Sequence, residues 1–289
     1  MSVTELHRPE RHAQGRTPSV PSTGSPGYKV TGRRVLRSEW AKFWSLRSSW
    51  ITLAVAAVLL IALGAIASAT YSPTATVNNG PPGSDSGTQD AVSLALLGAT
   101  FASLAVGVLG VLMSAGEYTT GMIRSTFAAV PRRLPVLWSK SAVIGVVALV
   151  TMTIGALAAF EFGMLGLHGQ KIALTLGDSG VLRSLLGAGA YLALVAVFGV
   201  ALGALLRSTA GAIAALAGIL LILPGLASLL PHSWHDTITP YLPSNAGSAA
   251  YALHEGANSL SPGAGLAVFA GWVALTLAGA VLRLVRSDA

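Results

Sequence analysis

The sequence predicts an all-α, polytopic membrane protein with six transmembrane helices, and three observations lead to this class. Of the 289 residues, 53% are apolar and only 10% are Asp, Glu, Lys or Arg, less than half of the roughly 25% found in ordinary soluble domains. Six stretches contain none of these four residue types and reach the length of about 20 residues that a helix needs to cross a bilayer. Too few polar residues remain to cover six apolar helices, which excludes a soluble fold.

Each stretch predicts one span and divides the chain into regions. The stretches cover residues 48–84 (apolar part 50–69), 91–116, 141–160, 184–206, 208–235 (apolar to about 230) and 256–282. We expect a disordered cytoplasmic tail over 1–30, an amphipathic helix over 31–49 and a six-span domain over 50–287. Gly199 and Gly203 predict close helix packing, either inside the bundle or at a subunit interface. Pro224 predicts a kink in the fifth stretch.

The basic residues predict the orientation of the chain. Sixteen of the 18 Lys and Arg residues fall before the first stretch, in alternate connections or in the tail, and Lys171 and Arg183 are the two exceptions. Because basic loops stay in the cytoplasm, both termini are expected there. The first apolar run begins near residue 50, behind a long polar segment, so we expect a permanent anchor and no cleavable signal peptide.

The segment before the first span predicts a helix lying on the inner membrane surface. Its apolar residues Leu36, Trp40, Phe43 and Trp44 fall at helical spacing on one face, and Arg34, Ser38, Ala41, Lys42 and Ser45 fall on the other. Trp favours headgroup depth and arginine favours anionic lipid, so anionic lipids are an expected partner.

Motifs for chemistry are missing from the sequence. It contains no cysteine and no GxxxxGK[ST] phosphate loop, so the chain by itself is not expected to be an enzyme that hydrolyses ATP, and no cofactor is expected. His232 and His235 are three residues apart, but no third metal ligand is near in sequence. The formal charge of +7 sits at the ends of apolar stretches, which does not indicate a nucleic-acid partner.

Glu161, at the end of the third stretch, either lines a pathway or marks the interface. No ionisable residue lies at the middle of a stretch, which argues against an ion pump or proton-coupled carrier with a carboxylate relay.

The most informative segment connects the second and third stretches. It reads GEYTTGMIRSTFAAVPRRLPVLWSK over residues 116–140. A short helix bounded by Gly121 and Pro131, with Phe127 beside Arg124, suits docking in a groove of a partner protein. The alternative is a basic loop that only follows the orientation rule.

Together with two other stretches, this segment resembles the permease subunit of bacterial ATP-binding-cassette (ABC) exporters of the type-2 class. The other stretches are RVLRSEWAKFWSLRSSW over residues 34–50 and YLPSNAG over residues 241–247. With the six spans, the resemblance covers about residues 31–287, and the segment over 116–140 is its most specific part.

The resemblance implies a fold, partners and site residues. It implies a connecting helix before the first span and a coupling helix, which seats on a separate ATPase subunit, between the second and third. By position the coupling element would comprise Glu117, Gly121, Arg124 and Phe127, flanked by Arg132, Arg133 and Lys140. The segment around Pro243 would form external re-entrant helices that close the pathway. Two permease chains, identical or different, and two ATPase chains in the cytoplasmic membrane are implied, with alternating access as the mechanism.

Other functions for a six-span chain stay open: a secondary carrier, or a membrane assembly or sensory subunit. A carrier is expected to show an inverted repeat with interrupted helices at matching places. Pro224 interrupts the fifth stretch, and the sequence shows no counterpart in the second. The apolar spans fit a lipid-like, peptide or drug cargo better than a small ion.

Overall fold

The computed structural model describes residues 31–72, 90–122, 134–229, 231–256 and 259–286, which fold into helices joined by turns. Six helical segments are long and apolar enough to cross a membrane: α2 (Arg47–Ala69), α4 (Ala99–Thr119), α6 (Leu134–Gly166), α7 (Val181–Leu206), the joined α8 (Thr209–Ala217), η1 (Gly218–Ile222) and α9 (Leu223–Ala227), and α12 (Pro262–Arg286). The shorter elements are α1 (Gly32–Ser45), α3 (Ala91–Ala95), α10 (His232–Ile238), η2 (Thr239–Tyr241) and α11 (Pro243–Ala249). The predicted all-α, six-span class is confirmed.

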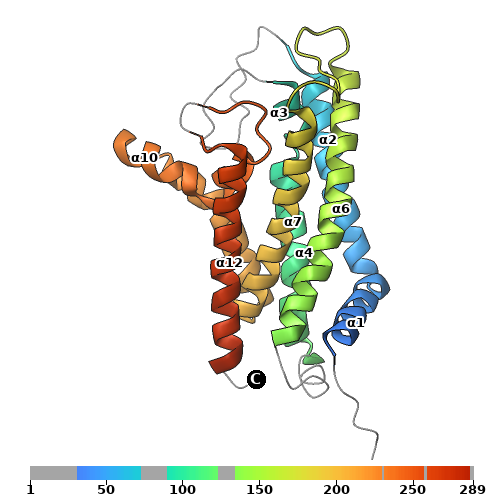
Figure 1. Ribbon diagram of the computed structural model, residues 1–289, viewed down its shortest axis with the longest axis vertical. Helices are drawn as coiled ribbons and strands as arrows, with labels where there is room; N and C mark the ends of the chain where they lie inside the picture. The colour runs from blue at the N-terminus through green and yellow to red at the C-terminus, as the bar shows by residue number, and fades with distance from the viewer. Residues whose placement is uncertain (1–30, 73–89, 123–133, 230, 257–258, 287–289) are drawn as a thin grey trace, which may run out of the picture. The chain divides into compact units, whose positions relative to one another are not determined.

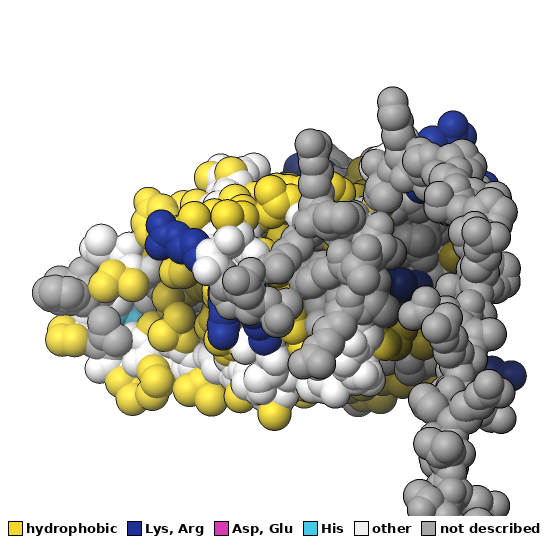
Figure 2. Space-filling model, turned by 90° about the horizontal axis from the view of Figure 1, so that it is seen from below, with side chains coloured by type: hydrophobic (Ala, Val, Ile, Leu, Met, Phe, Trp, Pro, Cys, Tyr) yellow, Lys and Arg dark blue, Asp and Glu magenta, His cyan; other side chains and the backbone are white. Residues whose placement is uncertain are grey.

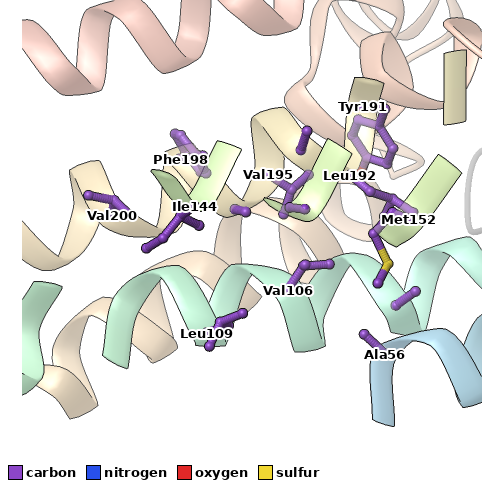
Figure 3. Close-up of a cluster of buried hydrophobic side chains, with 14 of the residues drawn as sticks. Ala56, Val106, Leu109, Ile144, Met152, Tyr191, Leu192, Val195, Phe198 and Val200 are labelled. Atoms are coloured by element: carbon purple, nitrogen blue, oxygen red, sulfur yellow. The ribbon is translucent and has the colours of Figure 1, made fainter. Parts of the chain in front are cut away.

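Helix α7 is the centre of the bundle. It packs against α4, α6 and α12 (Figure 1). In its most apolar 18 residues 72% are buried, against 28% in the same length of α2 and of α12. The core between α4, α6 and α7 consists of aliphatic and aromatic side chains that point toward one another (Figure 3), among them Val106, Ile144, Met152, Leu192 and Phe198.

Glycines bring α4 and α7 into backbone contact. A Cβ atom on Gly199 would overlap the carbonyl oxygen of Gly107, and one on Gly110 would overlap that of Ala196. Gly203 lies against the backbone of Ala115. Of the two interpretations of Gly199 and Gly203, packing inside the bundle is therefore confirmed.

The second apolar stretch is interrupted, contrary to expectation. Residues 96–98 form a turn between α3 and α4. A Cβ atom on Gly98 would overlap the carbonyl oxygen of Leu59, so glycine is the residue that fits this turn against the backbone of α2. The expectation that the second stretch has no interruption to match the one in the fifth is therefore wrong.

The kink expected at Pro224 takes the form of a π-helical turn. The backbone N–H of Leu223 donates to the carbonyl of Gly218, five residues earlier, and Pro224 stands in the first turn of α9. Proline lacks an N–H and its ring clashes with the carbonyl four residues before it. The wider turn over Gly218–Ile222 accommodates that clash.

The third span begins earlier than its charge-free stretch. Helix α6 starts at Leu134, with Pro135 in its first turn, a position that proline tolerates well. The residues from Leu134 to Lys140 therefore belong to the span, not to the preceding connection.

Short helices follow the fifth span. They are α10, η2 and α11, which lead back toward α12 at the upper end of Figure 1.

Candidate functional site

The ends of α4, α7 and α12 and the start of α6 lie together at the lower end of Figure 1, here called the basic end. Figure 2 looks onto this end and shows Lys and Arg side chains among apolar ones. Among the described residues that grey atoms leave visible in that view, no acidic side chain is seen. The two acids that the structure describes near this end, Glu39 and Glu117, have side chains that are 2% and 11% exposed.

Four charged side chains form a compact group at the basic end, here called the ion cluster: Glu39, Lys42, Glu117 and Lys140. The Lys140 ammonium lies 2.7 Å from Glu39 Oε2 and 2.9 Å from Glu117 Oε1. The Lys42 ammonium lies 2.8 Å from Glu39 Oε1 and 3.2 Å from Glu117 Oε1. Two residues come from α1, one from α4 and one from α6, so the cluster joins three helices.

The cluster is largely withdrawn from solvent. The side chains of Glu39, Lys140 and Glu117 are 2%, 5% and 11% exposed, and only Lys42 keeps a third of its surface, at 30%. Two carboxylates and two ammonium groups balance to zero charge. That balance is required because an unpaired charge in such a site costs several kcal/mol.

The cations keep Glu39 ionised. Burial alone raises the pKa of this carboxyl, but Lys140 and Lys42 outweigh burial and hold the pKa of Glu39 below its usual value. Burial likewise lowers the pKa of Lys42, and Glu39 and Glu117 outweigh it, so the pKa of Lys42 is raised. Both groups are charged at neutral pH.

One oxygen of the cluster has no partner among the described residues. Glu117 Oε2 is buried and accepts no hydrogen bond there. It belongs to the last turn of α4, immediately before the predicted coupling segment. The sequence analysis placed Glu117 in the coupling element, and the structure adds its contacts with α1 and α6.

A second set of contacts at the basic end, here called the arginine clamp, consists of Arg207 and Arg283. Arg283 Nη1 donates to the carbonyl of Leu205 in α7, and Arg207 Nη2 donates over 3.5 Å to the carbonyl of Arg283 in α12. Carbonyls at a helix C-terminus lack partners within the helix and carry partial negative charge, so each arginine caps the end of another segment. Sequence reasoning used both residues only to set orientation.

The last turn of α4 contacts both sets. Glu117 pairs with Lys42 and Lys140, and the next residue, Tyr118, lies under the guanidinium of Arg207, whose Cζ is 5.4 Å from the ring centroid. Arg207 has a φ of +54°, a conformation that costs a non-glycine residue free energy. The turn before the coupling segment thus links α1 and α6 with α7 and α12.

The structure places the remaining coupling residues as follows. Gly121 follows α4 with a φ of +74° and open space around its Cβ position, so glycine suits this turn. Lys140, expected to flank the coupling element, is instead buried in the ion cluster. Arg124, Phe127, Arg132 and Arg133 lie outside the described residues.

The predicted face of the amphipathic helix needs a correction. Leu36, Trp40 and Trp44 are exposed, but Phe43 is fully buried, with its ring 5.5 Å from that of Trp50. Helix α1 packs against α6 and buries Val35, Glu39 and Phe43, which are spaced four residues apart. Sequence reasoning missed this buried face because a carboxylate stands in its middle.

The two residues expected near a pathway differ in burial. Glu161 is exposed on α6, and Pro243 is buried in the first turn of α11. Beside α11, the Tyr191 ring of α7 lies 5.2 Å from the Phe269 ring of α12 and 5.9 Å from that of Tyr251. The first contact joins α7 to α12, and the second joins the turn after α11 to α7; neither assigns a pathway.

The end of the bundle opposite the basic end, where η2 and α11 meet the starts of α7 and α12, is here called the hairpin end. Side chains there also donate hydrogen bonds to backbone carbonyls. Trp272 Nε1 donates over 3.0 Å to the carbonyl of Tyr241. Arg183 Nη2 donates to the carbonyls of Ala252 and Leu253 over 2.9 and 3.1 Å. In the part of the chain that the structure describes, no three His, Cys, Asp or Glu side chains gather as metal ligands.

Comparison of the whole chain with protein-family models and with curated proteins finds no match.

Proposed function

We propose that this chain is the permease subunit of an ATP-driven exporter of the ABC type-2 class. Two copies of the chain, or one copy and a related chain, would form the pathway, and a separate ATPase subunit would bind the segment between α4 and α6. The chain itself would hydrolyse no ATP, and the basic end would face the cytoplasm. Membrane insertion is supported by the six apolar helices.

The observation that carries the proposal is the anchoring of both ends of the predicted coupling segment in one buried ion cluster. Glu117 stands at the end of α4 and Lys140 in the second turn of α6, and their charged atoms lie 2.9 Å apart. A displacement of α4 at Glu117 is therefore passed on to α6 at Lys140. Such a connection suits two spans that a partner bound between them in sequence is proposed to move.

The contacts around the cluster give this movement two routes through the bundle. One runs from Glu117 and Lys140 to Glu39 and Lys42 on α1, which continues into α2 after the single residue Leu46. The other runs from Tyr118 to Arg207 and on to the ends of α7 and α12. ATP-driven closure of the ATPases would then reach the spans of both halves of the chain.

A secondary carrier is the second candidate, and the break at residues 96–98 favours it. The second apolar stretch is broken before its span α4, and the fifth span contains a π-helical turn. A carrier with repeated halves is expected to show irregularities in both halves. The interruptions differ in kind, because the first is a turn held against α2 and the second is a π-helical turn next to a proline. A carrier would transport without an ATPase partner.

Purification from native membranes in mild detergent separates the two candidates. The exporter proposal expects a soluble chain with ATP-binding motifs at a fixed ratio to this protein, and expects Arg124→Glu to abolish that association. Arg286→Glu is the matched control, since it reverses an exposed charge at the same end and leaves the association intact.

The outcomes exclude one another. A pure preparation of this chain alone, with thermal stability unchanged, would reject the exporter and favour the carrier or a non-transport role. If the ATPase co-purifies but Arg124→Glu has no effect, the exporter stands and the coupling assignment falls.

A further inference from the structure

Helix α1 has an outward face that is both aromatic and exposed. Leu36, Trp40 and Trp44, here called the aromatic strip, are 43%, 43% and 52% exposed and stand four residues apart. The rings of Trp40 and Trp44 lie 5.9 Å apart, and Trp44 lies 4.4 Å from Trp50 in the first turn of α2. The strip therefore continues without a gap onto the first membrane span.

Arginines border this strip. Arg33 and Arg37 are exposed on α1, and each lies three residues before a member of the strip, which makes them neighbours on the helix surface. Arg47 is exposed at the start of α2, between Trp44 and Trp50 in the sequence. Arg33 and Arg37 thus lie along one side of the aromatic surface, and Arg47 lies where that surface meets the first span.

The fold buries the one acidic side chain of α1 that would offset the charge of these arginines. Glu39 is the only acid in α1, and its side chain is 2% exposed because Lys140 and Lys42 hold it in the ion cluster. From sequence alone Glu39 would offset one arginine of this helix. In the folded chain the exposed face of α1 carries arginine and tryptophan without an acid.

We propose that this face binds anionic phospholipid headgroups, with the Trp side chains at headgroup depth and Arg33, Arg37 and Arg47 on the lipid phosphates. Tryptophan favours the membrane interface, and each basic side chain near an anionic surface contributes attraction that salt screens. The surface joins directly onto a span, so its occupant is the adjoining leaflet. The inference goes beyond the proposed function, because it requires a membrane but no ATPase.

Fluorescence quenching by brominated lipids tests the proposal on the full chain. The protein is reconstituted in phosphatidylcholine vesicles that contain either brominated phosphatidylcholine or brominated phosphatidylglycerol at the same mole fraction. Trp138 is replaced by Phe in every sample, because it is exposed near the same end of the bundle. Brominated phosphatidylglycerol is expected to quench more strongly at low salt, and the difference is expected to shrink as salt is added.

Two double variants locate the preference. Arg33→Gln/Arg37→Gln is expected to weaken it by about fivefold for each arginine removed. Lys171→Gln/Arg286→Gln also removes two positive charges, but from exposed positions outside α1. This control variant is expected to keep the preference for phosphatidylglycerol. Both variants change only exposed side chains, and equal thermal stability checks that they fold.

Three results would overturn the proposal. Equal quenching by the two lipids in the protein with native arginines would show that the strip contacts lipid without charge selection. An unchanged preference in Arg33→Gln/Arg37→Gln would place the selection elsewhere. An equal loss of the preference in Lys171→Gln/Arg286→Gln would show that the net charge of the protein, and not the α1 face, selects the lipid.

Discussion

The basic end and the hairpin end of the bundle differ in the contacts that join their helices. At the basic end, charged side chains join α1, α4 and α6, and two arginines join α7 and α12. At the hairpin end, glycines let backbones touch: a Cβ atom on Gly187 would overlap the carbonyl oxygen of Ala250, and one on Gly265 that of Ala246. Charge contacts respond to pH, salt and a partner's charges, whereas close packing does not. The basic end is therefore the end suited to control by a partner.

Breaking one charge of the ion cluster is expected to have the largest effect. Lys140→Met leaves the buried carboxylates of Glu39 and Glu117 with Lys42 alone, and removing one partner of a buried pair costs about 3–5 kcal/mol. Thermal unfolding in detergent measures this loss. The double variant Glu39→Gln/Lys140→Met removes one charge of each sign and is expected to regain most of it.

Lys171→Met serves as the control, because Lys171 is exposed outside the spans, and it is expected to leave the unfolding temperature unchanged. Equal loss in Lys140→Met and in the double variant would mean that the cluster stabilises by packing and not by charge.

A substitution at the hairpin end sharpens the contrast. Gly187→Ala places a methyl group against the Ala250 backbone, and overpacking of this kind costs about 1–3 kcal/mol. Gly271→Ala is the matched control, since nothing lies near its Cβ position in α12, and there alanine improves helix propensity. The loss at Gly187 is expected to be the same at low and high salt, and a salt-dependent loss would contradict the comparison.

Acidification is expected to weaken the basic end selectively. Because the pKa of Glu39 is lowered in the folded protein, its contribution is present above the unfolded carboxyl pKa of about 4.3 and is lost as pH falls through the folded value. The stability difference between the native chain and Glu39→Gln should therefore shrink below about pH 4. Thermal unfolding across this range checks it, and a constant difference would show that Glu39 is not held ionised.

The arginine clamp should give the smallest effect. Arg207→Gly loses the contacts of the guanidinium but relieves the positive φ, whereas Arg207→Ala loses the contacts and keeps the strain. Alanine is therefore expected to be less stable than glycine by about 1 kcal/mol. Thermal unfolding of the two variants decides, and the opposite order would show that the φ of Arg207 carries no strain.

Much of the fold, but little of the site geometry, could be predicted from the sequence. The absence of charge over about 20 residues predicts a span whatever its neighbours are, so five of the six stretches correspond to one continuous helical segment each. The break at residues 96–98 lies where the backbone of α2 approaches Gly98, and no local sequence pattern records that contact.

The ion cluster shows the same limit at the candidate site. Glu39 and Lys42 are one helical turn apart, but Lys140 is about a hundred positions further along the chain. Without knowledge of which helices adjoin, Lys140 looks like a loop cation that sets orientation. A carboxylate within the buried face of α1 was the available signal, because such a group requires a cation from a neighbouring helix.

The proposed function requires that the ion cluster transmit movement from a partner ATPase to the spans. The chain has no cysteine, so spin labels at Ser38→Cys in α1 and Arg286→Cys in α12 are its only labels. Dilution with unlabelled chain isolates the distance within one copy. In the complex with its ATPase, the account predicts that ATP changes this distance in the otherwise native chain, and that Glu39→Gln/Lys140→Met abolishes the change while ATP hydrolysis continues. An identical ATP-driven change in both would contradict the claim.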